Sequence, residues 1–186
     1  MELQPEWNEF LRLLKHHGVR FVMVGGIAVG VHGHVRYTKD LDLLIDPSEA
    51  NARRLGNALV EFGFVATGRA WRQLTEPYRI LTLGVEPVRI DVLTSISGVA
   101  FRAVWKGHEV ISTLAGDVPV IGLAELRANK LATGRPQDLA DVAQLDAVAR
   151  MKVAARAPRR RASARDAGQR RRADGSRTAG ARRTRR

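Results

Sequence analysis

Two aspartates separated by one residue, Asp40 and Asp42, are the residues whose type and spacing most clearly suggest chemistry. They stand at the start of the apolar run 41–45 (LDLLI), which is typical of a buried strand. Side chains alternate between the faces of a strand, so both carboxylates would share one face while Leu41 points into the core. Mg²⁺ is usually held by one or two carboxylates together with substrate phosphates. Because an unpaired buried charge is costly, we favour a functional role over two acids that simply face solvent.

A glycine pair precedes the two acids. The apolar residues 20–24 (RFVMV) predict a short buried strand, and Gly25 and Gly26 follow it where a helix could begin. Glycines let backbone N–H groups approach a phosphate, and a helix N-terminus favours anions. Thirteen residues separate Gly26 from Asp40. This order predicts a phosphate subsite beside a metal subsite.

A third acid could complete a two-metal site. Asp91 lies in the apolar segment 88–93 (VRIDVL), which predicts a further strand. Arg89 would lie on the same face of that strand and could instead pair with Asp91. The sequence leaves both roles open for Asp91.

The elements that must position these residues alternate between helices and strands. Asp46 is expected to cap the N-terminus of a helix with Pro47 as its first residue and Glu49 as its third. Together the patterns predict an α+β fold, with a small mixed β-sheet flanked by helices. Helices are expected over 5–17, 47–62, 122–133 and 136–148 or a little beyond, and strands over 20–24, 41–45, 78–83 and 88–93, with weaker candidates at 109–112 and 118–121.

Charge divides the chain into a body and a tail. The 186 residues carry a net charge of +12, but residues 156–186 hold 13 Arg and two Asp and account for +11 of it. We therefore expect a folded domain over 1–153 and a disordered Arg-rich tail over 154–186, which has too little apolar surface to fold. Such a tail can bind RNA or DNA phosphates, can be merely solvated, or can result from a frame change in a GC-rich gene.

Composition excludes several classes of protein. The absence of Cys rules out a disulfide scaffold, a thiolate zinc site and a cysteine nucleophile. No apolar run approaches the roughly 18 residues of a membrane span, and the N-terminus lacks the features of a signal peptide. We expect a cytoplasmic protein without a membrane partner.

The order strand, Gly-Gly, helix, Asp-x-Asp resembles the signature of the DNA polymerase β-type nucleotidyltransferase superfamily. The segment 36–46 (RYTKDLDLLID) is similar to one branch, in which Arg-x-Thr precedes the paired acids. That branch includes abortive-infection nucleotidyltransferases of bacterial toxin–antitoxin pairs. Residues 122–145 (GLAELRANKLATGRPQDLADVAQL) resemble its C-terminal motif, so the resemblance spans about residues 20–146.

The resemblance implies roles for the residues already singled out. Gly25 and Gly26 would hold the triphosphate of an NTP, and Asp40 and Asp42 would bind Mg²⁺ or Mn²⁺. Asp91 matches the third acid of the superfamily, as a metal ligand or general base. Gly26 stands where many members have Ser, so a hydroxyl contact to phosphate is missing.

The resemblance also implies roles for polar residues outside the acid motif. Lys130 would contact phosphates, with Asp138 and Asp141 orienting it or the substrate, while Arg36 and Thr38 would belong to the nucleotide site. From the residues alone, Lys130 would be a solvated lysine on a helix face, and either acid could be structural. Arg36 could neutralise triphosphate charge or pair with the paired acids of the strand.

Three hypotheses follow. The first is an Mg²⁺-dependent nucleotidyltransferase that moves an NMP from an NTP to a hydroxyl on RNA, such as tRNA, or on a protein, within a toxin–antitoxin pair. The second is a non-catalytic nucleotide-binding or antitoxin-like partner protein. The third is a nucleic-acid-binding protein that acts through its basic tail.

Overall fold

The structure is a computed structural model that describes residues 2–64 and 70–156. Helices and strands alternate along the chain, as predicted, and both weaker strand candidates are confirmed. The elements are α1 (Pro5–His16), β1 (Phe21–Met23), α2 (Gly25–Val31), β2 (Asp40–Ile45), α3 (Glu49–Glu61), the 3₁₀ helix η1 (Ala70–Thr75), β3 (Ile80–Leu83), β4 (Arg89–Leu93), α4 (Phe101–Gly107), β5 (Glu109–Thr113), β6 (Gly116–Val120), α5 (Leu123–Thr133) and α6 (Pro136–Arg156).

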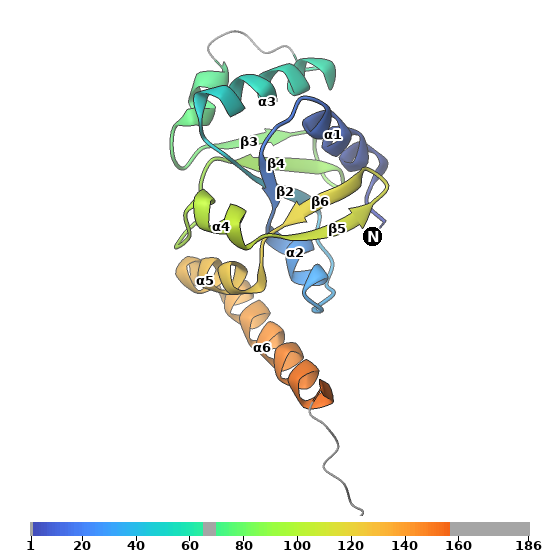
Figure 1. Cartoon of the computed structure of the whole chain (residues 1–186), viewed down its shortest axis with the longest axis vertical. Coiled ribbons are helices and arrows are strands. Elements are labelled where there is room, and N and C mark those ends of the chain that lie inside the picture. The colour runs from blue at the N-terminus through green and yellow to red at the C-terminus, as the bar shows by residue number, and fades with distance from the viewer. Residues whose placement is uncertain (1, 65–69, 157–186) are drawn as a thin grey trace, which may run out of the picture. The chain divides into compact units, whose positions relative to one another are not determined.

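One six-stranded sheet organises the fold (Figure 1), in the order β3-β4-β2-β1-β6-β5. Strand β2 pairs in parallel with β4 and antiparallel with β1, while β1 pairs in parallel with β6. The sheet is therefore mixed, and the predicted α+β class is confirmed. In Figure 1, α1 and α3 lie above the sheet, and α2 and α5 lie below it.

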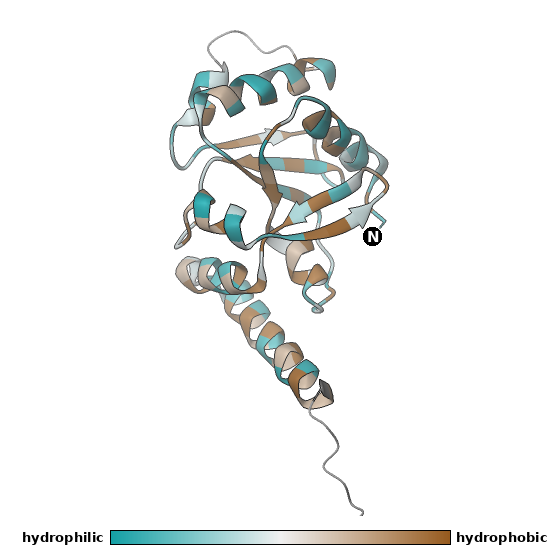
Figure 2. Cartoon of the chain, in the orientation of Figure 1, coloured by the Kyte–Doolittle hydropathy of each residue, from teal (hydrophilic) through white to brown (hydrophobic). Residues whose placement is uncertain are grey.

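The core lies between the sheet and the helices, and its residues follow the predicted periodicities. In α1 the apolar residues at helical spacing are buried, and in β2 every residue from Leu43 to Ile45 is fully buried together with Leu41. Burial on both faces at the end of β2 holds this strand rigidly at the centre of the sheet. Figure 2 shows the apolar residues along the central strands and hydrophilic residues on the outer turns of α1.

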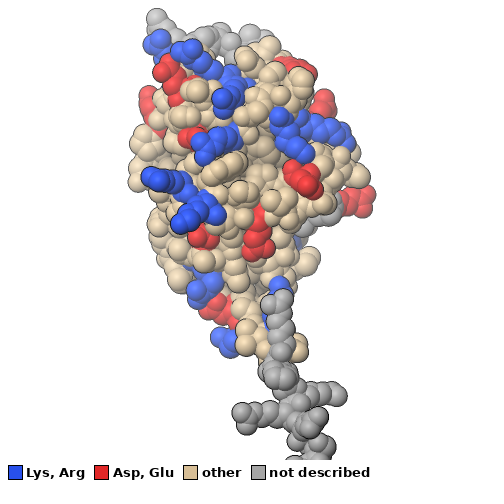
Figure 3. Space-filling view, viewed as in Figure 1, with Lys and Arg blue, Asp and Glu red and all other residues tan. Residues whose placement is uncertain are grey.

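Basic and acidic side chains are interspersed on the face shown in Figure 3. This agrees with the near balance of 18 Lys+Arg and 17 Asp+Glu over residues 1–155. The body must therefore be interpreted through its local clusters of charge.

Two elements begin two residues later than predicted. Helix α3 starts at Glu49 with Ser48 as its N-cap residue, because Asp46 is engaged elsewhere: it accepts hydrogen bonds from Arg20 Nη1 at 2.9 Å and from the Ser48 backbone N–H at 3.2 Å. Strand β3 starts at Ile80 and not at Tyr78, because Tyr78 has a left-handed backbone with φ of 59°, which a strand cannot contain.

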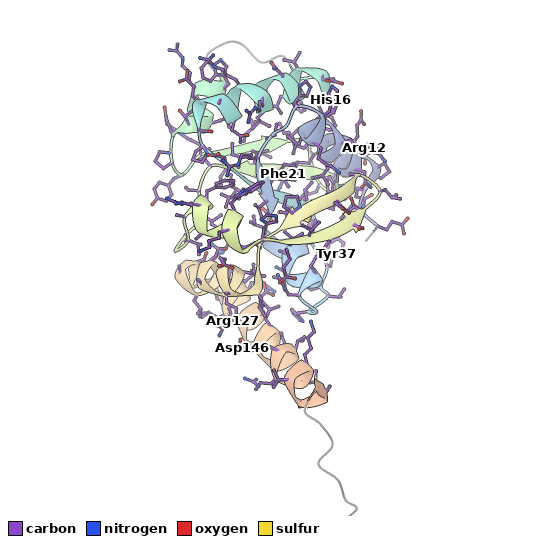
Figure 4. All side chains as sticks on the ribbon, viewed as in Figure 1. Arg12, His16, Phe21, Tyr37, Arg127 and Asp146 are labelled. Atoms are coloured by element: carbon purple, nitrogen blue, oxygen red, sulfur yellow. The ribbon has the colours of Figure 1, made fainter. Side chains whose placement is uncertain are left out.

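The last helix is longer than predicted. Helix α6 runs to Arg156, beyond the expected end near residue 148. Figure 4 labels Arg127 and Asp146, whose bidentate ion pair at 2.6 and 2.9 Å ties α5 to α6. The helix includes the first residues of the expected tail, and the tail from residue 157 onward lies outside the described residues.

Internal contacts group Met1–Arg150 as a first compact unit and assign the chain from Met151 onward to a second. All of the candidate site residues belong to the first unit. Within the described residues, no helix combines the length and the apolar character needed to cross a membrane.

Candidate active site

Three carboxylates gather on one face of the sheet. Asp40 and Asp42 point to the same side of β2, as predicted, and the parallel register with β4 places Asp91 directly opposite Asp42. One carboxylate oxygen from each of the three acids lies within 4.8 Å of the others. The structure therefore brings together the three acids that the sequence proposed as metal ligands.

The acid cluster fits a hard divalent cation. Mg²⁺ and Mn²⁺ prefer carboxylate oxygens, and three carboxylates at this spacing supply such ligands from two rigid strands. The acids are partly buried, so they remain open to a ligand on one side. The three acids could therefore bind a divalent metal ion.

Asp42 carries an electrostatic strain that a cation would relieve. Burial raises the pKa of Asp42 from 3.8 to about 6, and repulsion from Asp40 and Asp91 contributes in the same direction. Attraction to Arg89 and a hydrogen bond from the Gly26 backbone offset only part of this rise in pKa. A bound divalent ion would favour the ionised carboxylate.

The other two acids are held by neighbouring side chains. Asp40 accepts a hydrogen bond from Thr38 Oγ1 at 2.9 Å, and Asp91 accepts one from Thr82 Oγ1 at 2.7 Å. Arg89 Nη2 lies 2.5 Å from Asp40 Oδ2 and 3.3 Å from Asp91 Oδ2. The pairing of Arg89 with Asp91, left open by the sequence, is therefore present, and it includes Asp40 as well.

Both glycines of the pair are required by the packing of the site. Gly25 has a φ of +66°, and a Cβ atom there would overlap the carboxylate of Asp42. A Cβ atom at Gly26 would lie 2.6 Å from Thr38 Oγ1. The sequence analysis noted that Gly26 stands where a serine would supply a hydroxyl. The Thr38 hydroxyl lies beside the position that such a side chain would occupy.

Lys130 is buried, so its interpretation as a solvated lysine is wrong. Only 4% of Lys130 is exposed, and its Nζ lies 2.7 Å from Asp138 Oδ1 and 2.7 Å from Asp141 Oδ2. Arg135 Nε donates to Asp138 at 2.7 Å, and Arg36 binds Asp141 through Nε at 2.9 Å and Nη2 at 3.1 Å. Arg36 therefore pairs with Asp141 and not with the paired acids of β2.

Ion pairs determine the charge of this second cluster. Burial alone would raise the pKa of Asp138 and of Asp141, but hydrogen bonds and attraction to their cationic partners lower both pKa values overall. Both acids are therefore ionised at neutral pH. Three cations, from Lys130, Arg36 and Arg135, face two anions, so the cluster keeps an excess positive charge.

Asp42 of the acid cluster and Lys130 of the second cluster line the same cavity, which has a volume of about 340 Å³. Gly25 and Asp42 line it from the sheet side, and it is also lined by Lys130 of α5, by Asp138 of α6 and by Arg135 in the turn between these helices. This cavity joins four of the residues proposed from the sequence. Asp40, Asp91, Arg36 and Thr38 do not line this cavity. Thr38 bonds to Asp40 and Arg36 bonds to Asp141, while carboxylate oxygens of Asp40 and Asp91 lie within 4.8 Å of one of Asp42.

Several further residues of the cavity were not predicted from the sequence. They include Tyr78, Ser95, Asn129 and Arg135. Tyr78 is 83% exposed, and its backbone N–H donates to Ser95 Oγ at 2.8 Å, which helps to hold its left-handed conformation. Strain of this kind in a non-glycine residue is frequent at binding sites, but no sequence pattern indicates it.

Comparison with known proteins supports the fold. No protein-family model matches the sequence, and no curated protein is significantly similar to it. The structure is similar to that of TM1012 from Thermotoga maritima, a protein provisionally named a nucleotidyltransferase, with a TM-score of 0.50 and 16% sequence identity. The match covers 76% of this chain and 93% of TM1012. At this identity the likeness establishes a nucleotidyltransferase-like fold, and the chemistry must be argued from the residues.

Proposed function

We propose that the protein is a metal-dependent nucleotidyltransferase that transfers an NMP from an NTP to a hydroxyl group. The observation that carries this proposal is a single cavity lined both by Asp42, one of three close carboxylates, and by Lys130, which belongs to a buried cluster with an excess of positive charge. A nucleoside triphosphate with a divalent cation needs both kinds of charge. Carboxylates attract the cation, while lysine and arginine attract the phosphates.

A divalent cation held by Asp40, Asp42 and Asp91 would neutralise the triphosphate and lower the pKa of the acceptor hydroxyl. In the reaction, the acceptor oxygen bonds to the α-phosphorus, the bond from that phosphorus to its leaving oxygen breaks, and pyrophosphate departs. The hydroxyl proton passes to a carboxylate, for which we propose Asp91. Lys130 and Arg135 would hold the phosphates in line for the transfer.

The nucleoside would occupy the part of the cavity that Tyr78, Asn129 and Ser95 line. Tyr78, Asn129 and Ser95 supply there an exposed aromatic ring, an amide and a hydroxyl. An aromatic ring can stack on any base, and such stacking contributes about 1–3 kcal/mol per base. This arrangement suits binding of a nucleotide without strong selection for one base.

RNA, such as tRNA, or a protein would supply the acceptor hydroxyl, and the Arg-rich segment from residue 156 onward would assist an RNA acceptor through its charge. We include in the proposal a role within a toxin–antitoxin pair, with a cognate partner protein. These finer assignments rest on the resemblance of residues 36–46 and 122–145.

Label transfer tests the proposal directly. The full chain is incubated with each α-labelled NTP, Mg²⁺ or Mn²⁺, and either total bacterial RNA or total bacterial protein. We expect label on one acceptor class, and expect Asp40→Asn and Asp42→Asn to reduce transfer to background. Asp117→Asn, which removes an exposed acid of β6, is the matched control and should retain transfer.

The alternatives give different results in the same assay. NTP binding without transfer, unchanged in Asp42→Asn, would favour a non-catalytic nucleotide-binding or antitoxin-like protein. RNA binding that disappears on removal of residues 157–186, with no NTP binding, would favour a protein acting through its basic tail.

A further inference from the structure

Arg89 occupies a position among the acids that is unusual for a purely structural arginine. The β2–β4 register places it opposite Asp40 and two residues before Asp91, so its side chain lies on the acid face of the sheet. One guanidinium nitrogen, Nη2, contacts a carboxylate oxygen of each acid, at 2.5 Å for Asp40 and 3.3 Å for Asp91. A single positive group therefore bridges two carboxylates of the candidate metal site.

The carboxylate oxygens that Arg89 contacts are the ones left free by the surrounding hydroxyls. Thr38 donates to Oδ1 of Asp40 and Thr82 donates to Oδ1 of Asp91, so each acid has its Oδ2 directed to the bridging guanidinium. A cation that bridges Asp40 and Asp91 would compete for the same Oδ2 atoms. Two positive groups at the same oxygens would repel each other, so Arg89 opposes the binding of such an ion.

Two features indicate that the Arg89 side chain is not held firmly in this position. Its Nε is buried and has no hydrogen-bond partner in the part of the chain that the structure describes, so the guanidinium leaves one of its donors unused. About a third of the side chain is exposed, at 33%, so it has an open route away from the acids. A fully satisfied, enclosed guanidinium would show neither feature.

We infer that Arg89 is a displaceable internal cation, which takes the place of a divalent ion between Asp40 and Asp91 and must leave before that ion binds. The inference rests on the proposed function, because it assumes that the three acids bind metal. Arg89 therefore weakens metal binding to the free protein. A triphosphate would offset this competition, because its oxygens accept the donors that the arginine releases.

Measurement of Mn²⁺ affinity in the absence of nucleotide tests the inference without reference to activity. Free Mn²⁺ is followed by electron paramagnetic resonance during titration of the full chain. We expect Arg89→Gln to bind Mn²⁺ at least about tenfold more tightly than the wild type, because a positive charge and a competitor are both removed. Arg89→Lys keeps the charge and should stay close to the wild type.

Two controls assign the effect to this site. Arg53→Gln removes an exposed arginine on α3 and should leave Mn²⁺ affinity unchanged, which excludes an effect of net charge. Asp40→Asn combined with Arg89→Gln should remove the gain, which locates it at the acid cluster. Circular dichroism checks that each variant is folded.

The outcomes distinguish the role of Arg89 from the proposed function. Equal or weaker Mn²⁺ binding by folded Arg89→Gln, with wild-type binding that depends on Asp40, would overturn the role of Arg89 and leave the proposed function standing. Failure of both the wild type and Arg89→Gln to bind Mn²⁺ would overturn the metal site itself, and with it the proposed function.

Discussion

Replacement of Asp42 by Asn should stabilise the metal-free protein, although it removes a proposed metal ligand. The pKa of Asp42 is raised from 3.8 to about 6, chiefly by burial and then by repulsion from Asp40 and Asp91. Because the folded state binds the proton more tightly than the unfolded state, the contribution of Asp42 to stability is largest below pH 3.8 and is lost as pH rises through about 6. At neutral pH the ionised carboxylate therefore destabilises the fold.

The pKa shift gives the size of this effect. Each pKa unit corresponds to about 1.4 kcal/mol, so the cost of ionised Asp42 at neutral pH is about 3 kcal/mol. Asn has nearly the same shape, carries no charge and can still accept the hydrogen bond from the Gly26 backbone. We expect Asp42→Asn to increase the free energy of unfolding by about 1–3 kcal/mol at about pH 7.5.

Urea denaturation in EDTA, monitored by circular dichroism, provides the measurement. The advantage of the variant should shrink by about 1 kcal/mol between about pH 7.5 and about pH 5, where the wild-type carboxyl is increasingly protonated. Asp117→Asn should show no such pH-dependent advantage, since that acid is exposed. An Asp42→Asn protein that is no more stable than the wild type at about pH 7.5 would refute the reasoning. With saturating Mn²⁺ the order should reverse, because the ion stabilises only the protein that binds it.

Substitutions at three further residues test other parts of the site. Gly25→Ala should lower the free energy of unfolding by about 1–3 kcal/mol in urea titrations, because its Cβ would overlap Asp42 and its φ of +66° disfavours a side chain; an unchanged midpoint would contradict the packing described. Lys130→Met should lower the free energy of unfolding by about 3–5 kcal/mol in the same assay, because it leaves two buried carboxylates without their shared partner. A smaller loss would show that this lysine can be replaced without disturbing the two acids. Tyr78→Ala should raise the KM for NTP by about tenfold or more with little change in stability, whereas Tyr78→Phe should keep the wild-type KM; equal KM values for all three proteins would exclude stacking on this ring.

The sequence predicted those parts of the site that depend on local geometry. The side-chain alternation of a strand was enough to place Asp40 and Asp42 on one face, and the Gly25-Gly26 pair correctly marked the start of a helix. The closeness of Asp91 depends instead on the register between β2 and β4, which is a tertiary property. No local pattern could therefore decide whether Asp91 joins the acids or pairs with Arg89, and the structure shows that it does both.

The sequence was least informative where packing overrides local preference. Lys130 lies on α5, where a lysine would normally face solvent, but the turn into α6 brings Asp138 and Asp141 around its amine and buries all three. The same limit applies to Tyr78, whose left-handed backbone interrupts an otherwise strand-like segment. Such features arise from contacts between elements, and they coincide with the residues that line the cavity.

The ion pairs of the two clusters explain how a nearly neutral body can be suited to a highly charged ligand. Arg89 offsets part of the charge of the three acids, and Asp138 and Asp141 offset most of the charge of the cations around Lys130. What remains is an excess of negative charge on the sheet side of the cavity and an excess of positive charge on the helix side. A bare triphosphate would meet repulsion on the first side, and a bare divalent ion would meet it on the second. Under the proposed function, a complex of the two would match both sides at once, and this charge distribution would favour the metal-bound nucleotide over either component alone.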